Sequence, residues 1–95
     1  MGSYKLNEEA KMDLAQIYWR GRQEYTEAQA DGYYEAFFER FEELAEMPYK
    51  YQAVDHVREG YRRSVCGVDS IYYRLNGDVV EIMRILGRQD TSGFD

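Results

Sequence analysis

The feature that most limits the folds open to this chain is a long apolar stripe that ends at its only proline. Apolar side chains recur at spacings of three and four residues, at Ala30, Tyr33, Phe37, Phe41 and Leu44. That period predicts a helix with one buried face. Thr26 and Gln29 form a capping-box pattern at its start. Pro48 disfavours helix in the residue before it, so we expect this helix to end near Met47.

A second helical stripe precedes the first. It consists of Ala10, Leu14, Ile17 and Tyr18. Asn7 stands at its start, where a polar side chain can accept a free backbone N–H of the first turn. Only a few residues separate the two helices, which predicts an antiparallel hairpin. Upstream, residues 3–6 alternate and predict a short strand.

The second half of the chain predicts strands. Residues 61–66, 68–75 and 79–86 form three strand-like runs, and Asn76-Gly77-Asp78 is a hairpin signal between the last two. Residues 48–59 have no clear period and indicate a loop. The order is β-α-α-β-β-β, which predicts an α+β fold with a two-helix antiparallel hairpin packed on an antiparallel sheet. We expect one domain over residues 1–95, with a loose tail at about residues 91–95.

Composition excludes several classes of protein. Hydrophobic residues make up 44% and charged residues 32% of the 95 residues, which is typical of a folded domain. No apolar run is long enough to cross a membrane, and no signal peptide is visible, so we expect a cytoplasmic protein. The single cysteine fits a reducing compartment. One cysteine and one histidine nearly exclude a zinc site, and we expect no metal and no cofactor.

The formal charge of −6 is unevenly distributed. Residues 1–49 hold five basic and eleven acidic residues, whereas residues 50–95 hold seven of each. An acidic chain disfavours broad nucleic-acid binding, and we expect no direct sequence-specific binding to nucleic acid. Six of the seven basic residues in the second half are arginines, which suit bidentate contacts to carboxylates or phosphates.

Strict alternation along residues 79–86 places Arg84 on one face with Val80, Ile82 and Leu86. An arginine in such company should be partly buried and therefore needs an anionic partner. The candidates are a helix glutamate, Glu81, or a group on another molecule.

The remaining chemistry-bearing residues have plain structural interpretations. His56 lies in a polar loop, and Cys66 is expected to pack as a small apolar side chain at a strand end. The glutamates of the second helix predict a solvated face. Ten tyrosines exceed what one core can bury, so Tyr25, Tyr49 and Tyr51 are candidates either for a partner interface or for ordinary surface positions.

The order of the predicted helices and strands, together with the residues within them, resembles that of the ParE toxins of the RelE/ParE superfamily. Residues 6–18, LNEEAKMDLAQIY, resemble that family's opening L-S-x-x-A-x-x-D-L-x-x-I-Y. Further resemblances follow in sequence: the Gln29-Ala30-x-x-Tyr33 start of the second helix, LAEMP at 44–48, VREGYR at 57–62, IYYR at 71–74 and VEIMRIL at 80–86. They cover nearly the whole chain, from Tyr4 to Asp90.

The resemblance implies a toxin of a type II toxin–antitoxin system, of the kind linked to plasmid stabilisation. It implies DNA gyrase as the target and a ParD-like antitoxin whose disordered segment folds as it binds. Candidate target-binding residues are Arg62, Arg74, Arg84 and Arg88. Candidate antitoxin-binding residues are aromatic, namely Tyr18, Tyr33, Tyr34, Phe38, Tyr61 and Tyr73. A gyrase inhibitor of this kind carries out no chemistry and has no catalytic residues.

Two alternatives stay open at the level of sequence. One is a ribosome-dependent mRNA endonuclease of the RelE type, with Arg62 and Arg84 around the scissile phosphate. The segment after Leu86 contains no Tyr, His or Lys that could transfer a proton, which favours the inhibitor. The other alternative is a non-toxic copy that serves only as a partner for its antitoxin, because the family's usual C-terminal His is absent.

Overall fold

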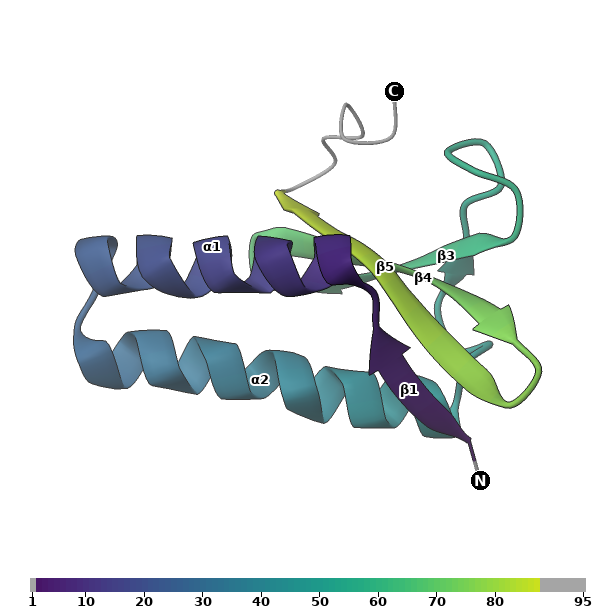
Figure 1. The fold of residues 1–95 in the computed structure, drawn as a ribbon, viewed down its shortest axis with the longest axis horizontal. Coiled ribbons are helices and arrows are strands. Elements are labelled where there is room, and N and C mark those ends of the chain that lie inside the picture. Colours follow the sequence, from purple (N-terminus) through teal and green to yellow (C-terminus); the bar gives the residue numbers. More distant parts are fainter. Residues whose placement is uncertain (1, 88–95) are drawn as a thin grey trace.

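The computed structural model describes residues 2–87 and has the predicted order of elements. Strand β1 (Ser3–Leu6) leads into helix α1 (Glu8–Glu24), and helix α2 (Glu27–Glu46) returns beside it. The strands β2 (Gln52–Ala53), β3 (Tyr61–Cys66), β4 (Asp69–Asn76) and β5 (Val79–Gly87) follow. The α+β prediction, with a helix hairpin on a sheet, is confirmed (Figure 1).

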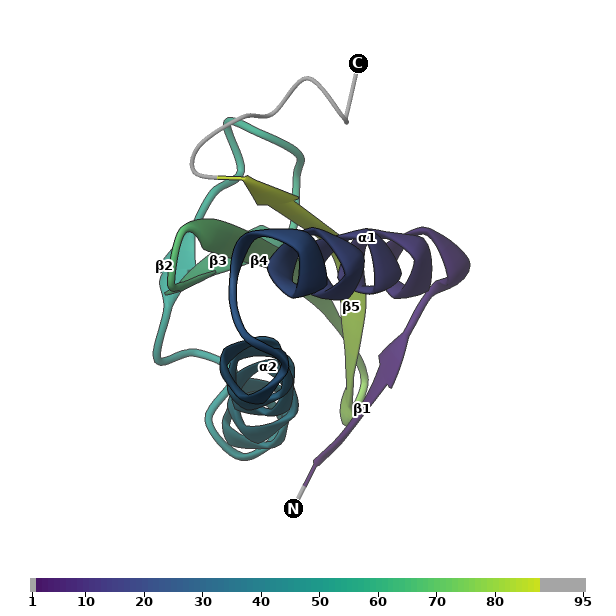
Figure 2. The ribbon, with the colours of Figure 1, turned by 90° about the vertical axis from the view of Figure 1, so that its left-hand side faces the viewer.

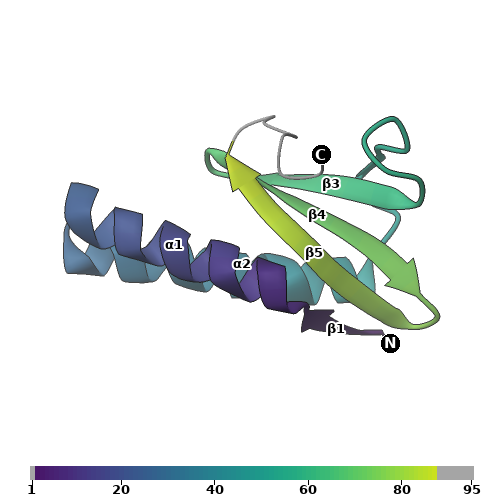
Figure 3. The same cartoon turned by 45° about the horizontal axis from the view of Figure 1, so that its top comes forward.

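Local capping explains where the helices begin. The Asn7 side chain accepts the Ala10 N–H at 2.9 Å. Both hydrogen bonds of the capping box between Thr26 and Gln29 are formed, each at 3.1 Å. Met47 caps the end of α2, directly before Pro48, as the sequence predicts. The helices lie antiparallel, and their far ends extend beyond the sheet (Figures 1 and 3).

The sheet has the order β1-β5-β4-β3-β2. The prediction of a purely antiparallel sheet is wrong in one respect, because β1 pairs with β5 in parallel, with Tyr4 opposite Val80. The strands β3, β4 and β5 form the expected antiparallel meander. Within the predicted loop, β2 adds a two-residue edge strand beside β3. Two residues are too few for a strand period to show in the sequence.

Two apolar clusters cover the two faces of the sheet. Figure 2 shows the two helices and the sheet in a view along the hairpin. The larger cluster lies between the hairpin and the sheet, and it contains most of the predicted apolar stripes. Its fully buried members include Ala10, Phe37, Phe41 and Leu44. On the opposite face, Val54, Tyr61 and Tyr72 form a smaller cluster beneath the loop before β3.

A β-bulge overturns the predicted alternation along β5. Tyr72 pairs with Arg84, but the next residue of β4, Tyr73, pairs with Ile82. Met83 is therefore an extra residue in β5, and every side chain beyond it changes face. Ile85 enters the core of the hairpin side, whereas Leu86 packs against the opposite cluster. Strict alternation predicts that Arg84 shares a face with Val80 and Ile82. Because of the bulge, Arg84 instead lies on the other face.

Candidate partner and target surfaces

Arg84 is held by helix α1. Where β1 ends, α1 continues along the same edge of β5 (Figure 1). Asp13 of α1 accepts two hydrogen bonds from the Arg84 guanidinium, at 2.7 and 3.1 Å, and also accepts the Ile85 N–H at 2.9 Å. Glu9 adds an outer contact at 3.3 Å. The hydrogen bond to Asp13 raises the pKa of Arg84.

The sequence prediction for Arg84 is therefore correct in two respects. Its side chain is only 18% exposed, and carboxylates of the same chain neutralise it. The main partner, Asp13, was not among the predicted partners. Asp13 lies three residues after Ala10 and four before Ile17, so it borders the apolar stripe of α1. That position is the signal that could have identified it.

Arg74 is paired on the opposite face of the sheet from the hairpin. Its Nε donates to Glu81 at 2.6 Å, and Lys5 approaches the other oxygen of Glu81 at 3.2 Å. The Glu81 side chain is 8% exposed, whereas that of Arg74 is 47% exposed. The hydrogen bond from Arg74, followed by the one from Lys5, lowers the pKa of Glu81.

Arg62 lies on the hairpin side of the sheet. Its guanidinium donates to the Tyr51 carbonyl at 2.7 Å and lies over the Tyr49 ring at 4.8 Å. The three candidate arginines of the described chain are thus held by different partners on two faces of the sheet. Arg88, the fourth candidate, lies outside the described residues.

The candidate aromatic residues of the hairpin form a connected group of rings. Tyr18 and Tyr34 lie 5.1 Å apart, and Tyr34 and Phe38 lie 5.0 Å apart, both edge to face. The Tyr18 hydroxyl donates to Asp31 at 2.6 Å, which raises the pKa of Tyr18. All three rings are partly exposed, so a partner can reach them.

Tyr33 faces the sheet and belongs to a polar cluster that the sequence analysis missed. Its hydroxyl donates to the Cys66 carbonyl at 2.7 Å and lies 2.9 Å from the carboxylate of Asp69. Asp69 is 1% exposed and also accepts a hydrogen bond from Arg20 at 3.1 Å. Burial, and then the hydrogen bond to Asp69, raise the pKa of Tyr33.

Two of the six candidate antitoxin contacts are buried. Tyr73 is 0% exposed and donates its hydroxyl to the Pro48 carbonyl at 2.8 Å. Burial raises the pKa of Tyr73 to about 12. Tyr61 is 4% exposed within the smaller cluster. The assignment of both to a partner surface is therefore corrected: they support the two faces of the sheet. Tyr25 and Tyr49, by contrast, are 61% and 72% exposed.

The face of the hairpin that carries Tyr34 is hollowed between the two helices. Two neighbouring hollows of about 450 and 390 Å³ share Ala15 and Tyr34, and we call them together the outer groove. One also contacts Tyr18, Trp19 and Glu35. The other hollow is further lined by Lys5, Leu6, Lys11, Leu14 and Phe38.

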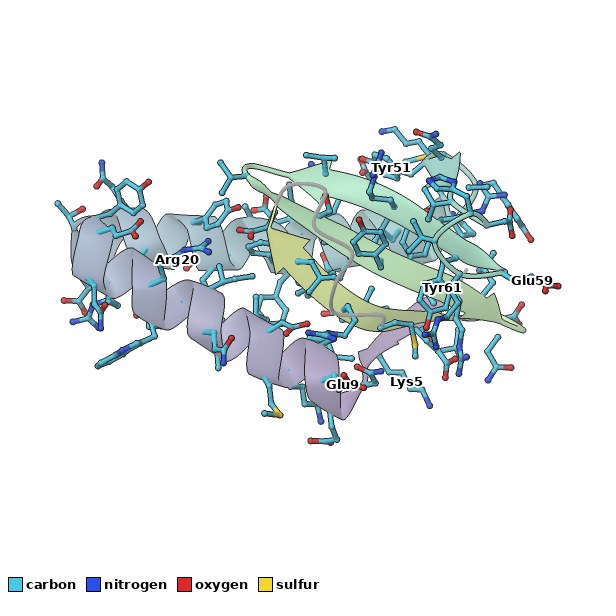
Figure 4. The ribbon with its side chains drawn as sticks, turned by 90° about the horizontal axis from the view of Figure 1, so that it is seen from above. Lys5, Glu9, Arg20, Tyr51, Glu59 and Tyr61 are labelled. Atoms are coloured by element: carbon cyan, nitrogen blue, oxygen red, sulfur yellow. The ribbon has the colours of Figure 1, made fainter. Side chains whose placement is uncertain are left out.

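A separate pocket of about 340 Å³ lies where the ends of the hairpin extend past the sheet. Tyr33, Val68 and Arg20 contribute to its wall. Figure 4 shows Arg20 on the hairpin, at the opposite end of the molecule from Glu59. The lining of this pocket is mostly apolar. The pocket therefore offers a recess for a partner's side chain rather than a set of reactive groups.

The reactive side chains of the chain have structural positions. Cys66 is 5% exposed, and burial raises the pKa of its thiol, which makes it an apolar packing residue as predicted. His56 is exposed in the loop before β3. Among residues 2–87, no group of three His, Cys, Asp or Glu side chains is placed to hold a metal ion. Within the same range, neither helix has the long apolar sequence needed to span a membrane.

The fold is that of a small α+β protein, in which a helix hairpin covers a mixed sheet and leaves an aromatic groove open between the helices. The same architecture occurs in a chain of the chromosomal ParDE toxin–antitoxin system from P. aeruginosa, with a TM-score of 0.81 over 94% of this chain and 98% of that one. Their sequences are 21% identical, so this likeness concerns the fold.

Sequence comparison is more specific. The chain is 36% identical over 86 residues to Toxin ParE1 of Caulobacter vibrioides. The aligned region covers 90% of this chain and 88% of that protein. Residues 4–91 match the family model of the ParE toxin of type II toxin–antitoxin systems. The chain therefore belongs to the ParE toxin family, and it is a ParE-type toxin of a type II toxin–antitoxin system.

Proposed function

We propose that this toxin inhibits DNA gyrase in the cytoplasm by binding to it, and that a ParD-like antitoxin neutralises it. The observation that carries the proposal is membership of the ParE family over residues 4–91. In this proposal the toxin is a ligand of its target and performs no reaction of its own.

The surroundings of the candidate reactive groups favour binding over catalysis. RNA cleavage needs a proton-transfer group beside cationic side chains that are free to stabilise a phosphate. Arg84 is instead neutralised by Asp13, and Arg62 is bound to a backbone carbonyl. The thiol of Cys66 is buried, which withholds it from proton transfer.

The candidate contacts divide between the two proposed partners. We assign the exposed aromatic rings of the outer groove, Tyr18, Tyr34 and Phe38, to the antitoxin, because interfaces are enriched in aromatic anchors. The arginines remain the proposed target contacts. Arg74 is exposed, whereas Arg62 and Arg84 are only partly exposed, so a target can reach Arg74 most readily.

The deciding experiment adds the purified toxin to gyrase supercoiling reactions and, in parallel, to translating ribosomes. We expect supercoiling to fail, with cleaved DNA accumulating and mRNA intact. Co-purified antitoxin from the adjacent gene should restore supercoiling. Cleaved mRNA beside normal gyrase activity would establish the endonuclease instead. Inertness in both reactions would mean that this copy is only a partner for its antitoxin.

A further inference from the structure

We infer that the edge of the sheet formed by β2 and β3 contacts the phosphate backbone of DNA, whatever its base sequence, while gyrase holds that DNA. We call this surface the arginine edge, and it consists of Tyr49, Lys50, Arg62 and Arg63. The inference rests on the proposed target and names the chemistry that this edge recognises. It follows from the ion pairing, the position and the charge of these residues.

Two neighbouring arginines carry positive charges that no carboxylate of the described chain neutralises. Within residues 2–87, five other arginines form ion pairs with carboxylates, namely Arg20, Arg22, Arg40, Arg74 and Arg84. In the same range Arg62 donates to a neutral carbonyl, that of Tyr51, and Arg63 forms no hydrogen bond or ion pair. Arginine is suited to bidentate contacts with phosphate, so this pair is equipped for an anion from outside the chain.

The position of this pair lets one ligand reach both side chains. Arg62 and Arg63 pair with Ala53 and Gln52 of β2, the strand that ends the sheet on this side. Successive side chains of a strand point to opposite faces, so the two guanidinium groups lie on either side of the sheet edge. Both side chains are partly exposed.

The arginine edge is separate from the outer groove. The groove is partly lined by Lys5, which belongs to β1 at the other edge of the sheet. Figure 4 shows Lys5 and Tyr51 on opposite sides of the molecule. A molecule bound at the arginine edge therefore does not need the surface that we assign to the antitoxin.

Two tyrosines hold the cations of this edge in place. The Tyr49 ring is 72% exposed and lies 4.8 Å from the guanidinium of Arg62. The ammonium of Lys50 lies 5.6 Å from the Tyr51 ring, and the Lys50 side chain is 48% exposed. Arginine, lysine and tyrosine side chains are all common phosphate contacts in protein–DNA complexes. Cations already held against rings lose less conformational freedom when they bind.

The charge around this edge is positive although the chain as a whole is acidic. Residues 49–63 contain four basic and two acidic residues, a balance of +2, whereas α2 contains seven acidic residues and one basic residue, a balance of −6. Glu43 of α2 reaches the edge, but there it is shared by Lys50 and Arg40. Such a separation of charge orients the toxin with the arginine edge toward a polyanion and keeps the acidic hairpin away from it.

The backbone of DNA suits this edge better than an acidic protein surface does. Duplex DNA carries about one negative charge per 1.7 Å of its axis, so it can supply phosphates to both arginines at once. A protein interface normally has an apolar centre, whereas β2 presents only Gln52 and Ala53. Base sequence is read by an element that enters a groove, and a two-residue strand is too short for that. The contact should therefore be independent of sequence.

The first test maps the contact without gyrase. The full-length, ¹⁵N-labelled toxin is titrated with short DNA duplexes of two unrelated sequences, and the amide chemical shifts are recorded by NMR. We expect changes at about 50 mM salt that are confined to residues 49–65, alike for both duplexes, and largely lost at about 200 mM salt. Absent changes at low salt, changes centred elsewhere, or changes with one duplex only would overturn the inference.

The second test measures the affinity of the toxin for gyrase alone and for gyrase bound to DNA. We expect binding to be about tenfold tighter when DNA is present, because several exposed charge contacts together contribute about that factor. Arg63→Gln should reduce this gain about threefold, and Arg63→Gln with Lys50→Gln should nearly abolish it. Affinity for gyrase alone should stay unchanged in both variants.

Arg22→Gln is the matched control. It removes the same charge from an exposed arginine in the last turn of α1, so it should leave the gain from DNA intact. Equal affinity of the unaltered toxin for gyrase with and without DNA would refute the inference. Equal losses for Arg63→Gln in both states would also refute it, since Arg63 would then contact the gyrase protein.

The two tests separate this surface from the proposed target. A toxin that inhibits gyrase but shows no mapped contact with DNA refutes the arginine edge alone. A toxin that binds DNA through the arginine edge but neither binds nor inhibits gyrase refutes the target and keeps the arginine edge as a contact for DNA.

Discussion

At the scale of single residues, buried polar side chains of this toxin occur in linked sets. Asp69, which is 1% exposed, receives hydrogen bonds from Tyr33 and Arg20. Glu81, which is 6% exposed, is paired with Arg74 and Lys5. A buried carboxylate without such partners would lose its hydration with nothing to replace it. The stability of the fold should therefore depend on the ionised state of these two carboxylates.

Glu81 should make stability depend on pH. The hydrogen bond from Arg74 lowers the pKa of Glu81 from its ordinary value of 4.5. The ionised carboxylate therefore stabilises the fold fully at pH values above 4.5, and this contribution is lost as the pH falls through the lowered pKa. We expect Glu81→Gln to reduce the free energy of unfolding at pH 7 by about 1–2 kcal/mol. The deficit should shrink and then vanish as the medium is acidified.

Urea unfolding of both proteins over a series of pH values measures this difference. Glu59→Gln serves as the control, because Glu59 is exposed in the loop before β3. A deficit for Glu81→Gln that stays constant from neutral to acidic pH would contradict the proposed electrostatic origin.

At the scale of elements, capping and turns fix where the helices and strands begin and end. The capping box at Thr26 closes the hairpin of helices within two residues of the end of α1. Gly67 and Gly77, both at φ 63°, form the two turns of the strand meander. The two turns differ in their surroundings. Gly67 lies against the Tyr33 ring, whereas nothing lies within 4 Å of a side chain added at Gly77.

This difference makes the two glycines a matched pair. Gly77→Ala should cost about 1–2 kcal/mol, the strain of a left-handed backbone in a residue with a side chain. Gly67→Ala should cost distinctly more, because the added methyl would lie 2.5 Å from the Tyr33 ring and disturb its hydrogen bonds to Cys66 and Asp69. Denaturant midpoints of the two variants measure the difference. Equal losses would show that Tyr33 moves aside without cost.

At the scale of the whole molecule, α1 covers the part of the β5 edge that β1 does not pair with. Asp13 accepts the Ile85 N–H of that edge and the Arg84 guanidinium, and so it joins parts of the chain 72 residues apart. An unpaired strand edge invites pairing with other chains, and covering it with a helix prevents this.

Asp13→Ala should therefore destabilise the fold by about 2–4 kcal/mol, because it removes the main acceptor of Arg84 and the side-chain acceptor of the Ile85 N–H. Asp13→Asn should cost less, since it keeps an acceptor oxygen. Glu9→Ala is the control within the same network: its side chain is 68% exposed, so its loss should cost less than about 1 kcal/mol. Chemical unfolding distinguishes these cases, and a Glu9→Ala loss as large as that of Asp13→Ala would refute the central role of Asp13.

Toxicity assays on the same variants separate folding from target contact. Arg84→Ala should weaken toxicity, and so should Asp13→Ala if the role of Arg84 is to hold β5 in place. Loss of toxicity in Arg84→Ala alone, with Asp13→Ala fully toxic at a temperature where both are folded, would indicate that Arg84 contacts the target directly.

The sequence by itself determined what depends on neighbouring residues. Caps at Asn7 and Thr26, the apolar stripes, the stop at Pro48 and the turn at Gly77 are local signals, and they give the helices, the hairpin and most of the strand order. The ordered resemblance across these elements identified the family correctly. The predicted partial burial of Arg84 is also confirmed, although the bulge removes the face shared with Val80 and Ile82 from which it was inferred.

Only the tertiary structure decided what depends on distant pairing. The parallel position of β1, the bulge at Met83 and the choice of Asp13 as partner of Arg84 arise from contacts across most of the chain. The tyrosines illustrate the same limit. Tyr34 and Tyr73 are the same residue type, yet packing leaves one in a groove and buries the other. The residue type sets what a side chain can bind, but the helices and strands packed against it determine whether it is exposed.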